Sequence, residues 1–187
     1  KNTSSGTIIS NGLGIDYSSA ANTIVFENEG LFKKVGESTE QINAQIKNTG
    51  TIQIEEGTLT SSISGSTFDG GIYNISEDAL FNITSNHTFS GELTGNVEGV
   101  FQISNAITVL ENDTASNNTS GNGMLLISGI LYGPGTFINN TIFTADNAQV
   151  KYLYDDLTFI NNGYLYLGTG TDHSNSYDLR IHSSALL

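Results

Sequence analysis

The stretch Phe159-Ile160-Asn161-Asn162-Gly163-Tyr164-Leu165 decides the fold class, because its pattern occurs three more times along the chain. The pattern is an apolar residue, then Asn, then Gly or Thr, then a second apolar residue, each two positions after the last. The other copies are Phe26–Phe32, Ile46–Ile52 and Phe137–Phe143. The marker asparagines lie 20 residues apart between Asn28 and Asn48, and 22 apart between Asn139 and Asn161. A strand and a turn that recur at this period are typical of a solenoid of stacked repeats.

The whole chain, residues 1–187, is predicted to be one β-solenoid domain. Dividing its length by a period of roughly 21 residues gives about nine coils. With about 4.8 Å between stacked strands, the rod would be roughly 43 Å long. Twenty-one Gly residues and many Asn, Ser and Thr residues supply frequent turns, so long helices are not expected. Short apolar runs with period-two character are the expected strands: Thr23–Phe26, Thr51–Ile54, Ala79–Ile83, Val100–Ile103, Met124–Ile127 and Tyr164–Leu167.

Two segments depart from the repeat. Residues 1–22 are rich in Ser, Gly and Asn, and are predicted to form an irregular first coil or a cap over the open sheet edge. Residues 111–123 are thirteen polar or small residues in a row, which predicts a protruding loop. Such a loop is either a binding excursion or a flexible insertion. The apolar end at residues 183–187 favours a segment cut from a longer secreted protein.

The parity of the pattern predicts which side chains face the interior. Positions two before and four after each marker Asn are apolar in all four copies, so the Asn shares their inward face. An inward amide without a partner would cost about 1 kcal/mol or more. Stacked amides can bond to one another and to turn backbone, as in other ladders of asparagine. We therefore expect Asn28, Asn48, Asn139 and Asn161 to form a structural ladder.

Residues 23–167 resemble the parallel β-helix of pectin-lyase-like domains, in particular the Asn/Gly/Thr-rich repeats of large bacterial adhesin-like surface proteins. The resemblance implies a right-handed coil and a secreted or cell-surface location. Handedness comes from the resemblance alone, since the period indicates only a solenoid of stacked parallel strands.

Charge and composition exclude several classes of partner. Six basic residues against nineteen acidic ones give a net charge of -13, which argues against nucleic acid and anionic membranes. The absence of cysteine excludes disulfides and thiolate metal sites. No apolar stretch indicates membrane insertion, and no cofactor motif is present.

Catalytic patterns are faint. Hydrolases that resemble this fold use clustered aspartates near Gly-His-Gly and Arg-Ile-Lys motifs, and here only Asp155-Asp156 and Arg180-Ile181-His182 echo them. A polysaccharide lyase or hydrolase is therefore the less favoured hypothesis. The three histidines, His87, His173 and His182, lack the spacing of metal ligands, so no metal site is predicted.

Four tyrosines flank the last marker: Tyr152, Tyr154, Tyr164 and Tyr166. Because Leu165 and Leu167 take the inward positions, Tyr164 and Tyr166 are expected to point outwards. Exposed rings can stack on sugar faces, which makes the four tyrosines candidate glycan contacts. The alternative is that they are strand-forming residues that pack across neighbouring coils.

The sequence favours a non-enzymatic structural or adhesive segment of an extracellular or cell-surface protein. Its partner would be an extracellular glycan or a surface protein of a host or neighbouring cell, with the oligomeric state left open. The alternative is a polysaccharide-binding or polysaccharide-processing β-helix module. Ice binding is a third hypothesis, but it requires flat ranks of Thr, and Thr169-Gly170-Thr171 is isolated.

Overall fold

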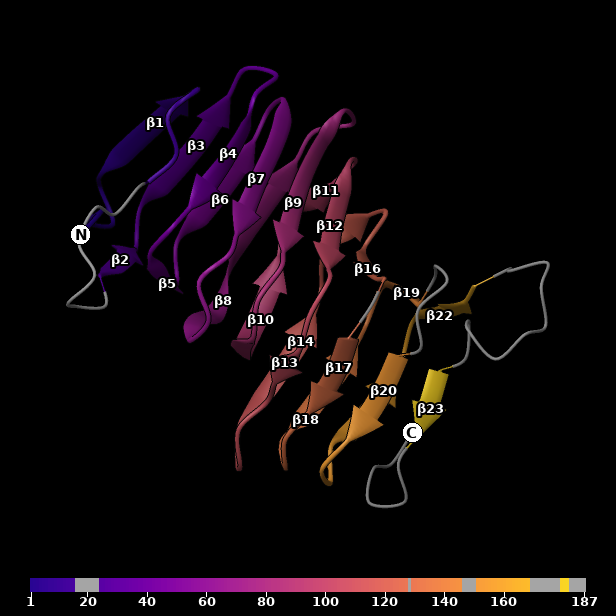
Figure 1. Cartoon of the computed structure of the whole chain (residues 1–187). Helices are drawn as coiled ribbons and strands as arrows, with labels where there is room; N and C mark the ends of the chain where they lie inside the picture. The colour runs from indigo at the N-terminus through magenta and orange to yellow at the C-terminus, as the bar shows by residue number, and fades with distance from the viewer. Residues whose placement is uncertain (16–23, 128, 146–150, 169–178, 182–187) are drawn as a thin grey trace.

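The chain folds as an all-β parallel solenoid of about 7 turns, with ~22 residues per turn. The computed structural model describes residues 1–15, 24–127, 129–145, 151–168 and 179–181. Strands of successive turns pair in parallel, as between β18 (Thr136–Asn139) and β21 (Thr158–Asn161). Figure 1 shows the strands of successive turns stacked along the solenoid. The fold class therefore agrees with the sequence period, but the turns are fewer than nine. Dividing the whole chain length by the period overestimates the number of turns. That length includes the chain ends, and the division ignores the longer turn near residue 115.

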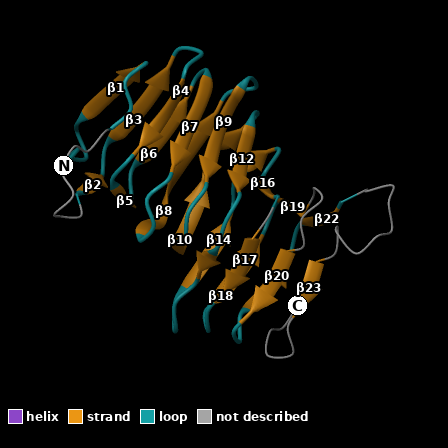
Figure 2. Cartoon of the chain, in the orientation of Figure 1, coloured by secondary structure: helices purple, strands orange, loops and turns teal. Residues whose placement is uncertain are grey.

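Each full turn runs along three walls of the solenoid. Among the described residues, walls 1 and 2 share strands β8 and β10 and form one 16-stranded sheet, whereas wall 3 is a separate 7-stranded sheet. In Figure 2 the described residues carry only strand and loop colours.

Wall 1 contains β2 (Val25–Asn28), β5 (Gln45–Asn48), the first halves of β8 (Ser66–Ile75) and β10 (His87–Thr94), β13 (Ile107–Thr108), β17 (Gly129–Tyr132), β20 (Lys151–Tyr154) and β23 (Leu179–Ile181). Wall 2 contains β1 (Thr7–Asn11), β3 (Leu31–Val35), β6 (Thr51–Ile54), the second halves of β8 and β10, β11 (Asn96–Val97), β14 (Thr114–Asn117), β15 (Ser120–Gly121), β18 and β21. Wall 3 contains β4 (Thr39–Ile42), β7 (Gly57–Ser61), β9 (Ala79–Ile83), β12 (Val100–Ile103), β16 (Met124–Leu126), β19 (Ile142–Ala145) and β22 (Tyr164–Leu167).

The core is a continuous column inside these walls. Residues at the predicted inward parity are buried, among them Ile46, Ile52, Phe137 and Phe143. Leu165, in the last described full turn, is only partly buried against the core. Edge-on and tilted aromatic contacts fill the middle of the column, where Phe68, Tyr73, Phe81, Phe89 and Phe101 meet.

Residues 111–123 do not form a protruding loop, so that prediction is wrong. Strand β14 pairs with β10 on one side and with β18 on the other, while β15 pairs back with β11. Ala115, Asn117 and Thr119 are fully buried. The segment is polar because its backbone and small side chains bond to neighbouring turns, as when Asn118 N donates to Leu93 O at 2.8 Å.

This turn also changes the cross-section of the solenoid. In the N-terminal turns, wall 2 is the column β1, β3, β6, second half of β8, β11 and β15. In the C-terminal turns, wall 2 continues instead through β14 and β18, which are labelled in Figure 1, and then through β21. The solenoid turn that contains β14 and β15 contributes one strand to each column: β15 to the N-terminal column and β14 to the C-terminal one. It needs extra residues to do so, since Ile107 pairs with Leu131, 24 positions later.

The N-terminal segment forms a partial turn on the first full one. Strand β1 stacks on β3, and isolated bridges join Asn2 to Asn28 and Ile15 to Ile42. Residues 1–15 thus form a partial turn stacked on the first full one, and residues 16–22 of the predicted first coil or cap lie outside the described residues.

Candidate functional site

The marker asparagines of the N-terminal turns form a buried ladder. Asn28 Nδ2 donates to Asn48 Oδ1 at 2.7 Å, and both residues are fully buried. Asn2 extends the ladder, since its Nδ2 donates to Asn28 Oδ1 at 2.8 Å. The same amides also donate to backbone carbonyls, as when Asn28 Nδ2 donates to Thr51 O at 3.1 Å. These amides therefore have partners inside the protein and are occupied in holding turns together.

A tyrosine ends this ladder inside the core. Asn48 Nδ2 donates to the Tyr73 hydroxyl at 3.0 Å, and that hydroxyl donates to Gly70 O at 3.0 Å. Burial raises the pKa of the Tyr73 phenol far above its ordinary value, so the hydroxyl stays protonated at physiological pH. In the next turn Phe68 takes the register position of Asn48, so a ring replaces the amide there.

The other two marker asparagines belong to a second ladder at a different corner. Asn117 Nδ2 donates to Asn139 Oδ1 at 3.0 Å, and Asn139 Nδ2 donates to Asn161 Oδ1 at 2.8 Å. Asn28 and Asn48 lie between walls 1 and 2, whereas Asn139 and Asn161 lie between walls 2 and 3. The four predicted residues are therefore two ladders rather than one, because the cross-section changes between them.

The four tyrosines named from the sequence do not form one group. Tyr152 and Tyr154 lie on β20 in wall 1, and Tyr164 and Tyr166 lie on β22 in wall 3. The rings of Tyr164 and Tyr166 are stacked with centroids 6.3 Å apart, and both side chains are exposed. The structure thus places two separate tyrosine pairs on two walls.

A further tyrosine joins the wall 1 pair. Tyr132, at the end of β17, is in register with Tyr154, and Ile130 is in register with Tyr152. Sequence reasoning missed Tyr132. The offset of 22 residues that relates Asn139 to Asn161 also relates Tyr132 to Tyr154, so the signal was present in the sequence.

Tyr132 and Tyr154 line a surface groove of about 370 Å³ on wall 1. We call this site the tyrosine groove; its other lining residues are Asn86, Asn105, Ala106, Ile130 and Asp155. Its volume is within the range of small-molecule sites. It combines ring surface with amide and carboxylate groups, which can contact apolar and hydroxyl-bearing faces of one ligand.

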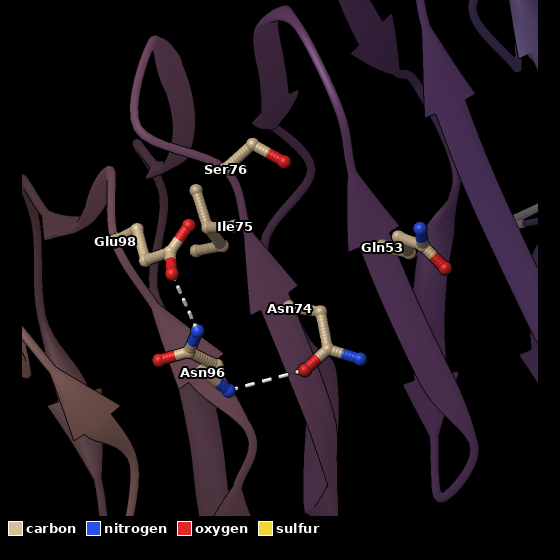
Figure 3. Close-up of a pocket in the computed structure, with 6 residues that line it drawn as sticks. All are labelled: Gln53, Asn74, Ile75, Ser76, Asn96 and Glu98. Atoms are coloured by element: carbon tan, nitrogen blue, oxygen red, sulfur yellow. Dashed lines mark hydrogen bonds between the residues drawn. The ribbon is translucent and has the colours of Figure 1, made fainter.

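A second, more polar groove of about 270 Å³ lies on wall 2. Figure 3 shows its lining residues, Gln53, Asn74, Ile75, Ser76, Asn96 and Glu98, drawn from three successive turns. Asn96 N donates to Asn74 Oδ1 at 3.1 Å, and Asn96 Nδ2 donates to Glu98 Oε1 at 3.0 Å. Some of its polar groups therefore already bond to one another.

The faint catalytic echo at Asp155-Asp156 is a turn. Both residues have left-handed backbone conformations, with φ of 54° and 60°, and both are exposed.

His173, His182 and Thr169-Gly170-Thr171 lie outside the described residues, and Arg180 is described only as part of β23. Across the described ranges, no three His, Cys, Asp or Glu side chains gather closely enough to hold a metal ion. The described part of the chain also holds no helix with the length and apolar character of a membrane span.

His87 is buried in the core between turns. Its Nε2 lies 3.2 Å from Ser61 Oγ, its ring packs edge-on against Phe68, and its Nδ1 has no hydrogen-bond partner among the described residues. Burial lowers the pKa of His87 to about 4, so the imidazole is neutral at physiological pH. Because His87 is 2% exposed, it is a core residue rather than a surface ligand.

A buried ion pair lies near the N-terminal end of the solenoid. Lys34 Nζ lies 3.9 Å from Glu40 Oε1, and both side chains are fully buried. Ser10 Oγ donates to Glu40 Oε2 at 2.5 Å, and Gly12 N donates to Glu40 Oε1 at 2.6 Å. Lys34 Nζ also donates to Gly36 O. The charges are therefore satisfied within the fold.

The chain has no significant match among protein-family models, curated proteins or solved structures.

Proposed function

We propose that this chain is a non-enzymatic rod segment of an extracellular or cell-surface protein, and that it acts as a stalk, spacer or adhesive surface. One observation carries the proposal: the core and the stacked walls extend through about 7 turns. Each turn adds to the same rod and contacts mainly its neighbours, so the architecture suits a spacer of extendable length. At about 4.8 Å per turn, these turns span roughly 34 Å.

Surface chemistry supports the same role. A net charge of -13 keeps the rod soluble and disfavours anionic partners. The resemblance to the Asn/Gly/Thr-rich repeats of bacterial adhesin-like proteins supports the surface location and a right-handed coil. The proposed location and the proposed role as stalk, spacer or adhesive surface both concern the rod as a whole rather than a single catalytic cleft.

Location is tested by immunolabelling of the cells that produce the protein. Antibodies raised against the purified chain should label intact cells, or detect the chain in the medium, as strongly as they label lysed cells. Labelling that requires lysis, with no chain in the medium, would overturn the extracellular assignment.

The non-enzymatic part has its own test. The chain is incubated with a panel of plant and microbial polysaccharides, and new reducing ends and unsaturated sugar products are measured. We expect no product above that of heat-denatured protein. Product formation that is lost in Asp155→Asn would overturn the proposal and favour a polysaccharide hydrolase.

A further inference from the structure

The tyrosine groove has a rigid framework. The inward neighbours of its rings, Leu131 and Leu153, are buried in the core, and they fix the backbone of β17 and β20. The two strands pair in register over four residues each, which places Tyr132 and Tyr154 next to one another on the outer face. Tyr132 is half-buried, and Tyr154 is 38% exposed. The rings therefore form an aromatic surface that is ordered by the turns beneath it.

Polar groups border this aromatic surface. Asn105 is held by two hydrogen bonds: its Nδ2 donates to Thr84 O at 3.0 Å, and its Oδ1 accepts from Ala106 N at 2.8 Å. Asn86 precedes β10, is exposed and also lines the groove. The turn at Asp155 places a carboxylate directly after Tyr154. Amide and carboxylate groups thus lie beside two rings in one groove.

We propose that the tyrosine groove is a binding site for a neutral oligosaccharide. Pyranose rings present an apolar face, which packs on an aromatic ring, and a rim of hydroxyls, which bond to amides and carboxylates. The net charge of -13 and the carboxylate of Asp155 disfavour glycans that carry uronic acids or sulfates. The inference rests on the proposed adhesive role and names the ligand class that the rod would hold.

The test uses the whole chain and a panel of neutral oligosaccharides built from glucose, mannose, galactose, xylose or N-acetylglucosamine. Binding is followed by calorimetry and by amide chemical-shift changes. At least one member should bind, with shifts confined to β17, β20 and the turns that line the groove. Tyr132→Ala and Tyr154→Ala should each weaken it about tenfold or more, whereas Tyr154→Phe, which keeps the ring, should stay within about threefold.

Matched variants separate the groove from general surface effects. Tyr164→Ala removes an exposed tyrosine on wall 3 and should leave binding unchanged. Asp155→Asn removes the groove carboxylate but suits the left-handed backbone, and should weaken binding about threefold or more. Asp156→Asn makes the same change at the neighbouring left-handed position outside the groove, and should have no effect.

Several outcomes would overturn the inference: no binding to any neutral sugar, binding only to acidic glycans, shifts centred on Tyr164 and Tyr166, or binding that survives both alanine variants. A purified peptide library that binds the groove in place of sugars would overturn it as well. None of these results bears on the extracellular rod, which is tested by cell labelling and would stand without the groove.

Discussion

The amide of Asn48 ends its ladder on the hydroxyl of Tyr73, 3.0 Å away and fully inside the core. The hydroxyl in turn donates a hydrogen bond to Gly70 O at 3.0 Å. The Tyr73 hydroxyl thus satisfies both the amide donor of Asn48 and the carbonyl acceptor of Gly70. It does so where an aromatic residue replaces Asn at the register position of the ladder.

Replacing Tyr73 by Phe should lower the free energy of unfolding by about 1–2 kcal/mol. The change removes a buried hydroxyl that accepts a hydrogen bond from Asn48 and donates one to Gly70 O. The measurement is urea denaturation followed by circular dichroism. Tyr164→Phe, at a tyrosine that is 68% exposed, should change the value by less than about 0.5 kcal/mol. Equal effects of the two variants would contradict the importance of the buried hydroxyl.

The C-terminal turns offer a matched pair of ladders. Asn139 is buried between Asn117 and Asn161, while its neighbour Asn140 is exposed and bonds to Asn118 and Asn162 with the donor direction reversed. Asn139→Ala should destabilise the chain by about 2–3 kcal/mol, since buried donors and acceptors lose partners. Asn140→Ala should cost less than about 0.5 kcal/mol, because water replaces the lost bonds. Thermal and urea unfolding of both variants check this, and a larger loss for Asn140→Ala would refute it.

The period and parity of the marker pattern were enough to predict the solenoid and the burial of its apolar positions, except that Leu165 in the last described full turn is only partly buried. They could not predict where the wall arrangement changes, because that depends on which backbone groups pair between turns. Residues 111–123 show why: short polar side chains are typical of loops, yet here they bond to adjacent turns and are partly buried.

The ladders and the groove were only partly predictable. Asn2 lacks the flanking apolar residues that define the marker pattern, so its place in the ladder depends on the bridge to Asn28. Tyr132 could have been predicted from the sequence, since it lies one 22-residue period before Tyr154. The inward position of Lys34 follows from the parity of Phe32, but its burial depends on Glu40, which approaches from another wall.

Acid should destabilise the chain through His87. Its pKa in the fold is about 4 against an ordinary 6.5, so between these values the unfolded chain binds a proton that the folded chain does not. The stability contributed by neutral His87 is therefore complete above about pH 6.5 and is lost as pH falls towards 4, by about 3 kcal/mol in total. Unfolding free energies from pH 4 to 8 measure this change.

His87→Gln is the control for the other titrating groups, since its side chain is neutral throughout that range. The difference between the native chain and His87→Gln should rise with pH between about 4 and 6.5 and then level off. A difference that does not vary with pH would show that His87 is not the group responsible.

The buried pair of Lys34 and Glu40 should be strongly coupled. Lys34→Met leaves the carboxylate without its cation in a dry place, and should cost about 3–5 kcal/mol of stability. Adding Glu40→Gln removes that charge while an amide oxygen can still accept from Gly12 N, so the double variant should recover to within about 2 kcal/mol of the native chain. Lys33→Met, which breaks the more exposed pair with Glu55, should cost less than about 1 kcal/mol. Urea unfolding of the native chain, Lys34→Met, Glu40→Gln and the double variant gives the coupling energy, and additive losses at Lys34 and Glu40 would mean that the two charges do not act as a pair.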